Sequence, residues 1–331
     1  VSVTLPETCK TIREYAFYSN TKLETINTEK VTLIGERAFA SCTSLETIDL
    51  SNLYAVGVSA FLGASSLTSV DLSSLRNAGK EVFKDTTSLT NVIFNDNTKL
   101  SYGMFVNSGL TSIELGMNRI PDFAFANCAN LTSVVIKNDL ISLGEGAFSG
   151  CTKLTSFVFE GEVEWIYDQA FYNCLLLQTL DLPNSKIKFG SYVFYKCESL
   201  DTIGFKEKTE IESIGGNTFK DTKLSRFIVD SNNMLYTVKN DGSLLIILAA
   251  PKASYGDLVI DSNITAIAKG AFSGVDVITT VTFQGTSIDI GDYAFANISG
   301  LTTVTLPTGS STIGNYAFHS CSALTTVNNL A

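Results

Sequence analysis

The sequence is poor in the residues on which many enzyme and nucleic-acid sites depend. Its 331 residues include one histidine, His319, and one tryptophan, and only 17% of them are charged. The formal net charge is −10, and no basic stripe of the kind that binds nucleic acid is visible. We therefore expect a protein that binds neither nucleic acid nor an anionic membrane surface.

Long hydrophobic runs are also missing. The apolar tract Leu244–Ala250 is far shorter than the roughly 18 residues that a membrane-spanning helix needs. No signal peptide precedes Val1, and the chain opens in the middle of a repeating pattern. We expect no membrane insertion by this segment, and we interpret it as an excised piece, or a mature form, of a longer protein whose flanking segments are absent.

What the sequence does contain is one motif, repeated along almost its whole length. Ile34–Leu50 reads IGERAFASCTSLETIDL and returns with variations at Leu143–Phe159 and at Ile290–Leu306. The motif is marked by a recurring phenylalanine: Phe17, Phe39, Phe61, Phe83, Phe105, Phe125, Phe148, Phe171, Phe194, Phe219, Phe272, Phe295 and Phe318. A short fixed period of this kind predicts a solenoid, here a single body over residues 1–331 with about thirteen coils.

Each repeat divides into a strand and a turn. The L-x-x-V-x-L part, as in Leu45, Ile48 and Leu50, ends in the alternation of a half-buried strand. The A-F-x-x-C-x-x-L part is too short for a full helix, so we predict one helical or 3₁₀ turn. Glycine four residues before most of the phenylalanines suits a bend that would not tolerate a Cβ.

Six of the seven cysteines form a column three residues after the phenylalanine: Cys42, Cys128, Cys151, Cys174, Cys197 and Cys321. We interpret them as small buried thiols, because cysteine packs like a small apolar residue. Other coils place Asn, Ala, Thr or Ser at this point, which favours a spatial role. A linear ladder does not provide convergent zinc ligands, so no metal site is predicted.

The repeat I-G-x-x-A-F-x-x-C-x-x-L-x-x-V-x-L-P resembles the BspA-type leucine-rich repeat of bacterial surface proteins, over nearly the whole chain. The resemblance implies an α/β repeat solenoid: a right-handed, curved superhelix with a parallel β-sheet on its concave side. It also implies a secreted or cell-surface protein, used for adhesion or recognition.

One segment interrupts the repeat, and we interpret residues 230–262 as an inserted β-hairpin. Two apolar runs, Leu235–Val238 and Ser243–Leu248, flank a turn at Lys239–Gly242 that contains Asp-Gly. Similar insertions are part of the resemblance. The segment is a lid or brace over the coil junction, a protruding recognition element, or a break that changes the curvature of the solenoid.

A mixed apolar and acidic column is the candidate binding surface on the sheet. Outward-facing positions of successive strands carry Asp71, Ile93, Glu114, Val135, Val158 and Asp181. Concave solenoid faces commonly bind partners. The alternative is that these residues only fill positions compatible with a sheet.

A second candidate is Trp165 with Tyr167, expected on the convex edge. Two large rings with polar edges suit contacts with a protein or a sugar. Packing against the neighbouring coil is the alternative.

Catalysis is not expected. We find no nucleophile elbow, phosphate loop or metal-ligand pair. Asp49 and Asp71 should lie one coil apart, a spacing compatible with acid chemistry or calcium, but on an open face that does not exclude water. The sequence therefore predicts a non-catalytic protein without a cofactor that binds an extracellular or host protein, with a carbohydrate-binding module as the alternative.

Overall fold

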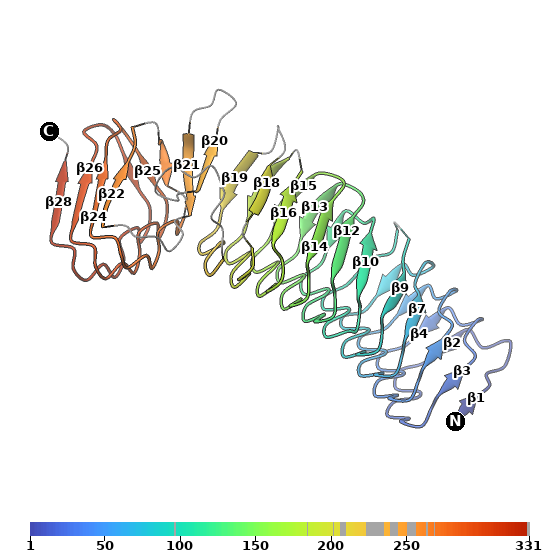
Figure 1. Cartoon of the computed structure of the whole chain (residues 1–331). Coiled ribbons are helices and arrows are strands. Elements are labelled where there is room, and N and C mark those ends of the chain that lie inside the picture. Colours follow the sequence, from blue (N-terminus) through green and yellow to red (C-terminus); the bar gives the residue numbers. More distant parts are fainter. Residues whose placement is uncertain are drawn as a thin grey trace.

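The computed structural model describes residues 1–95, 97–183, 185–200, 202–205, 210–222, 235–238, 244–249, 256–262, 264–267 and 269–329. It is a parallel β-solenoid of about twelve turns. Figure 1 shows the coils stacked one after another, with the two termini at opposite ends of an elongated body.

In the described coils, the L-x-x-V-x-L segments form a first row of strands. These are β1 (Ser2–Val3), β3 (Thr25–Ile26), β5 (Thr47–Ile48), β7 (Ser69–Asp71), β9 (Asn91–Ile93), β10 (Ser112–Leu115), β12 (Ser133–Ile136), β14 (Ser156–Phe159), β16 (Thr179–Leu182), β18 (Thr202–Phe205), β22 (Asp257–Ile260), β24 (Thr280–Phe283), β26 (Thr303–Leu306) and β28 (Thr326–Asn329). Strands of adjacent coils pair in parallel, in four consecutive sheets.

The return path of most described coils, though not of the coil that contains β9, forms a second row of strands, which the sequence showed only as an inward aliphatic column. These are β2 (Thr11–Ile12), β4 (Leu33–Ile34), β6 (Ala55–Val56), β8 (Asn77–Ala78), β11 (Arg119–Ile120), β13 (Leu140–Leu143), β15 (Val163–Ile166), β17 (Lys186–Phe189), β19 (Glu210–Ile214), β20 (Leu235–Val238), β21 (Leu244–Ala249), β23 (Ala266–Ile267), β25 (Asp289–Ile290) and β27 (Thr312–Ile313). Many span two residues, too few to display an alternating pattern.

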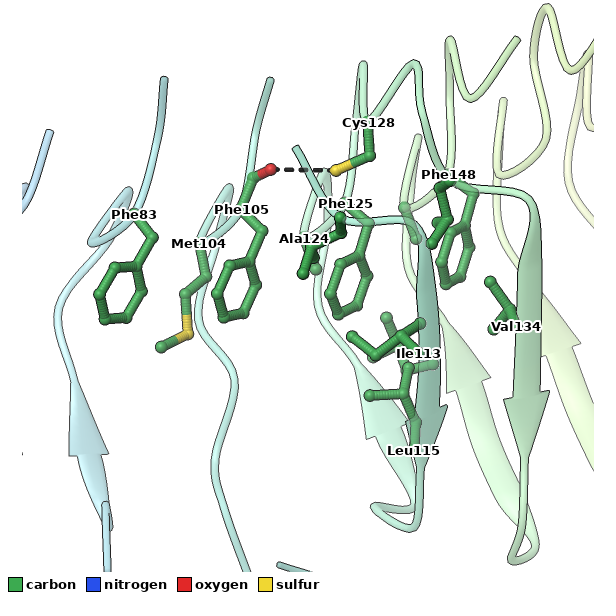
Figure 2. Close-up of a cluster of buried hydrophobic side chains, with 14 of the residues drawn as sticks. Phe83, Met104, Phe105, Ile113, Leu115, Ala124, Phe125, Cys128, Val134 and Phe148 are labelled. Carbon is green, nitrogen blue, oxygen red and sulfur yellow. Dashed lines mark hydrogen bonds between the residues drawn. The ribbon is translucent and has the colours of Figure 1, made fainter. Parts of the chain in front are cut away.

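The core is a set of columns that run along the solenoid, and the phenylalanine column is its clearest member. Phe39 and Phe61 are fully buried, and their rings stack at 5.2 Å between centroids with 4° between planes. Figure 2 shows the same arrangement for Phe83, Phe105, Phe125 and Phe148. Each of these inner rings therefore has a ring of the coil before it and one of the coil after it as neighbours, an arrangement that a single coil could not provide.

The predicted helical turn is wrong: no helix occurs in the described residues, where the A-F segments are turns. The reason is the backbone conformation. Two residues per turn have positive φ, at the second position before and the second after the phenylalanine, as in Arg37 (48°) and Ser41 (60°) around Phe39. A left-handed residue every four positions is incompatible with a right-handed helix.

The turns of adjacent coils are joined by backbone hydrogen bonds. Within the turn around Phe17, the amide nitrogens of Tyr15, Phe17 and Ser19 donate to carbonyls of the next coil at 2.7–2.8 Å. The amides between them close local i→i+3 bonds, such as Tyr18 N to Tyr15 O at 3.1 Å. The turn side is thus hydrogen-bonded from coil to coil, as the strands within each sheet are.

The cysteine column consists of free, largely buried thiols, and each thiol has a polar role. Cys128 Sγ donates to the carbonyl oxygen of Phe105, one coil earlier, at 3.1 Å (Figure 2). The same bond, at 2.9–3.3 Å, recurs in the other coils of the column, from Cys42, Cys151, Cys174, Cys197 and Cys321. The column therefore links turns as well as filling space, which the sequence alone did not show.

The glycines four residues before the phenylalanine are required by close approach rather than by a bend. A Cβ on Gly57 would lie 2.4 Å from the backbone nitrogen of Glu36 in the preceding coil, and one on Gly79 would lie 2.4 Å from that of Val58. Neither glycine has a positive φ. The backbones of neighbouring coils are in direct contact here.

The buried apolar side chains of the described residues fall into two groups. The buried residues form one core from Ile12 to Phe219 and another from Leu258 to Ala317. A Cβ on Gly270 would lie 2.9 Å from Cα of Gly216, so coils more than fifty residues apart in sequence touch on the turn side. Strands β20 and β21 pair in antiparallel fashion. The turn predicted between them lies outside the described residues, and the assignment of 230–262 as an insertion stays a prediction.

Candidate recognition surfaces

The six residues of the acidic-apolar column each come from a different strand of the first row. We call them the strand patch: Asp71 on β7, Ile93 on β9, Glu114 on β10, Val135 on β12, Val158 on β14 and Asp181 on β16. Register pairs Asp71 with Ile93. It also aligns Glu114 with Val135 and Val135 with Val158. The breaks between β9 and β10 and between β14 and β16 divide the patch into three parts.

The apolar members of the strand patch are open to solvent to different degrees. Ile93 is 50% exposed and Val158 is 43% exposed, whereas Val135 is half-buried. Neighbouring outward positions in this row are mostly threonine and serine, and several of those hydroxyls bond to the preceding coil, as in Thr132 Oγ1 to Thr111 O at 2.9 Å. Aliphatic side chains without such bonds therefore stand out on this face.

Two of the three acidic members, Glu114 and Asp71, are engaged with neighbours. Glu114 forms an ion pair with Lys137. Asp71 Oδ1 accepts from the amide of Ser73 at 2.9 Å, and Asp49 accepts from the amide of Ser51 at the same distance. Asp49 and Asp71 therefore cap the turns that follow their strands, which gives the pair a structural explanation. Among the described residues, no cluster of three or more His, Cys, Asp or Glu side chains could hold a metal ion.

The aromatic pair lies on the second row of strands. Trp165 belongs to β15 and is in register with Ser142 and Lys188, and Tyr167 follows that strand directly. The two rings stack at 5.3 Å with 12° between planes, and Lys188 Nζ lies 4.8 Å from the Trp165 ring centroid. Tyr167 is 41% exposed but Trp165 is half-buried, because a ring and an ammonium group cover it.

A third group of aromatic residues, which was not predicted from the sequence, lies on the turn side. We call Tyr172, Tyr192, Tyr195, Lys196 and Lys220 the turn-edge cluster. Tyr195 contacts Tyr172 at 5.5 Å and Tyr192 at 5.6 Å between ring centroids. The sequence did offer a signal: each of these residues lies one after, two before or two after a column phenylalanine, within the turn.

The lone histidine and one surface hollow lie outside the predicted sites. His319 is exposed. Among the ring contacts of the described residues, its imidazole has one, edge-on to the ring of Tyr316 at 5.6 Å between centroids. A shallow hollow of about 410 Å³ lies against β6 and β8, where its lining includes Arg76, Asn77 and Lys99. None of the predicted site residues lines it. No helix in the described part of the chain is long and apolar enough to cross a membrane.

Comparison with known proteins identifies the repeat. The sequence profile described as "BspA type Leucine rich repeat region (6 copies)" matches residues 1–115, 118–239 and 252–330. A leucine-rich repeat protein from Bacteroides ovatus ATCC 8483 is 22% identical, with a TM-score of 0.56, and the match covers 99% of this chain and 78% of that one. This likeness shows the fold.

More distant structures share less of the shape. A leucine-rich cell surface protein from Faecalibacterium prausnitzii A2-165 is 18% identical over 100% of this chain and 88% of its own, with a TM-score of 0.41. The pneumococcal vaccine antigen PcpA is 16% identical over 99% and 71%, with a TM-score of 0.34. A search of curated proteins finds no match.

Proposed function

We propose that this chain, which belongs to the BspA-type leucine-rich repeat family, is a non-catalytic recognition module that binds an extracellular or host protein through its strand patch. The observation that carries the proposal is the exposure of Ile93 and Val158 on a row of strands where many other outward positions carry threonine or serine. Exposed aliphatic groups beside carboxylates suit a partner surface that is apolar at its centre and basic at its rim.

The location that supports this role is the outside of a bacterial cell. The family resemblance implies secretion or surface display, and it implies that the first row of strands lines the concave side. A solenoid of parallel rows offers an extended surface of this kind without an enclosed pocket. Recognition of a large partner therefore suits the fold better than catalysis, which needs a site that excludes water.

The proposal is tested by binding of the purified chain to a panel of immobilised extracellular-matrix proteins. We expect saturable binding to at least one of them, weakened about tenfold by the triple substitution Ile93→Ala, Val135→Ala and Val158→Ala. Val259→Ala is the matched control. Val259 is 39% exposed and occupies the equivalent position of β22, a strand that packs on the second of the two cores. Unchanged binding by the triple variant, or an equal loss with Val259→Ala, would rule out the strand patch.

A second candidate function is carbohydrate binding by Trp165 and Tyr167. Their stacked rings, together with the ammonium group of Lys188, form an aromatic surface with polar edges. A glycan array run in parallel distinguishes this from protein binding: glycan binding lost in Trp165→Ala would assign the site to β15. Acrylamide quenching of Trp165 fluorescence measures ring access independently, and we expect partial quenching, in keeping with its half-buried ring.

A further inference from the structure

We propose that the turn-edge cluster binds an acidic polysaccharide, with Lys196 and Lys220 meeting its anionic groups and Tyr172, Tyr192 and Tyr195 contacting its sugar rings. This site is on the turn side of the coils, away from both rows of strands. It does not depend on the function proposed for the strand patch, and each proposal can fail without the other.

Backbone hydrogen bonds set the spacing of the cluster. Asn173 N donates to Tyr195 O at 2.8 Å, and Lys196 N donates to Lys220 O at 3.2 Å. These bonds place Tyr172, Tyr195 and Lys220 at the same position of three consecutive coils, each one residue after its phenylalanine. Side chains that leave a hydrogen-bonded ladder start from fixed points, so the cluster is ordered before any ligand arrives.

The tyrosine rings hold the two ammonium groups. Lys196 Nζ lies 5.9 Å from the centroid of Tyr172 and 5.6 Å from that of Tyr195, between two rings. Lys220 Nζ lies 5.8 Å from the centroid of Tyr195. These distances fall within the range in which a ring attracts a cation. The rings thereby concentrate two positive charges at one place on the edge.

In the part of the chain that the structure describes, neither Lys196 nor Lys220 forms an ion pair with a carboxylate, whereas Lys84 pairs with Glu81 at 2.8 Å. The cluster is therefore a local concentration of positive charge on a chain of net charge −10. Such a place favours an anionic ligand over the rest of the surface.

The form of the cluster favours a polysaccharide. The coils repeat along the edge at about 4.8 Å, so the site presents groups at regular intervals on an open ridge rather than in a pocket. A polymer with an acidic group on repeating sugars can place an anion at each lysine. Its rings can then lie against the exposed parts of the tyrosines, of which Tyr192 is 38% exposed. Tyrosine hydroxyls add hydrogen-bonding groups beside the rings.

Binding is measured by isothermal titration with four probes: an oligogalacturonate, which carries carboxylates, a heparin oligosaccharide, which also carries sulfates, a neutral dextran oligosaccharide, and poly-glutamate. We expect binding of at least one acidic oligosaccharide, weaker at higher salt because the charges are exposed, and none of dextran. The two acidic probes distinguish carboxylate from sulfate recognition. Absence of binding to both, or equal binding of poly-glutamate, would overturn the proposal.

Variants locate the site. The double substitution Lys196→Gln and Lys220→Gln should weaken binding of the acidic oligosaccharide about tenfold or more. Tyr195→Leu should also weaken it, because it removes the ring shared by both ammonium groups. The control Lys22→Gln with Lys80→Gln makes the same change in net charge at exposed sites elsewhere, and Lys80 itself lies over a lone ring, Tyr102, at 5.5 Å.

The control variant should bind within about twofold of the unchanged protein. An equal loss in both double variants would show that only the overall charge matters, which contradicts a site at the turn edge. Thermal unfolding of each variant is recorded alongside. If a variant binds less but keeps the unfolding midpoint of the unchanged protein, the substitution has removed a contact with the ligand and has not unfolded the chain.

Discussion

The strand side and the turn side of each coil are built by different rules. On the strand side, Ile48 and Leu50 point inward while Thr47 and Asp49 point outward, so an alternating pattern and parallel pairing account for the structure. On the turn side, left-handed residues, backbone contact and thiol hydrogen bonds replace that pattern. The strand side follows one alternating pattern, whereas the turn side also depends on contacts between particular atoms of neighbouring coils.

The difference also bears on function. Outward strand positions are free to vary, and they carry the strand patch. Outward turn positions are fixed by a tight backbone, and they carry the turn-edge cluster. A surface whose residues can change suits the evolution of binding to a particular partner. A rigid surface suits a ligand whose chemical groups repeat at a fixed spacing. Substitutions that affect the two sides differently therefore test this comparison, and their expected effects range from the loss of a core ring to the ionisation of a single thiol.

Removing one ring from the middle of the phenylalanine column should have the largest effect. Phe125 is fully buried between Phe105 at 5.5 Å and Phe148 at 5.2 Å. Phe125→Ala should lower the free energy of unfolding by about 3–5 kcal/mol, measured by urea denaturation. Phe318 has a described ring partner only in Phe295 and is half-buried, so Phe318→Ala should cost about half as much. Equal losses would contradict a column that acts through both neighbours.

Adding a methyl group between two turns should have the second largest effect on stability. Gly57→Ala places a Cβ 2.4 Å from Glu36 N, and the backbone has no room to yield, so we expect a loss of about 3 kcal/mol. Gly216 has nothing within 4 Å of the same added atom, and Gly216→Ala should change stability by less than about 1 kcal/mol. Thermal unfolding of the pair measures the contrast, and a tolerated Gly57→Ala would refute direct backbone contact.

Substitution by a β-branched residue should lower stability on the turn side but not on the strand side. Ser41 has a φ of 60°, so Ser41→Val should cost roughly 1–2 kcal/mol, while Ser41→Gly should cost nothing. Thr47 is exposed on β5, and Thr47→Val should change stability by less than about 0.5 kcal/mol. Comparable losses at both positions in urea denaturation would show that the turn conformation is not what limits the residue type.

The thiol column should make stability fall at alkaline pH. Burial raises the pKa of Cys128 to about 11 from an ordinary value of 9.0, so the unfolded chain loses this proton first. The stabilisation is complete below pH 9 and declines between pH 9 and about pH 11, by at most about 1.4 kcal/mol per pH unit for each such thiol. Cys128→Ala should flatten this decline in a pH series of urea denaturations. An unchanged slope would contradict it.

The sequence predicts the strand side well, and the reason is visible in single coils. The spacing of Leu45, Ile48 and Leu50 repeats one alternation, and register between coils follows from the constant period. The solenoid, its family resemblance and the phenylalanine column were therefore all readable from the chain. The positions of the strand patch along successive strands follow from the same period.

The turn side was less readable, because its interactions join residues one coil apart. The donation from Cys128 Sγ to Phe105 O depends on stacking, and nothing local to either residue signals it. Asn and Ser two positions after the phenylalanine did signal a left-handed residue, as at Asn127 and Ser41, but a helical turn was the simpler local interpretation. Stacking also explains why Trp165 is half-buried, since Lys188 of the next coil covers it.

Amide hydrogen exchange tests most directly whether the turn side is an ordered ladder equal to the strand rows. Phe125 N donates to Ala147 O at 2.9 Å and Asn127 N to Ser149 O at 2.7 Å, both across coils. We predict that these amides exchange as slowly as that of Val134 on β12, whereas loose turns would exchange orders of magnitude faster. Fast exchange at Phe125 and Asn127 beside a protected Val134 would contradict an ordered turn side.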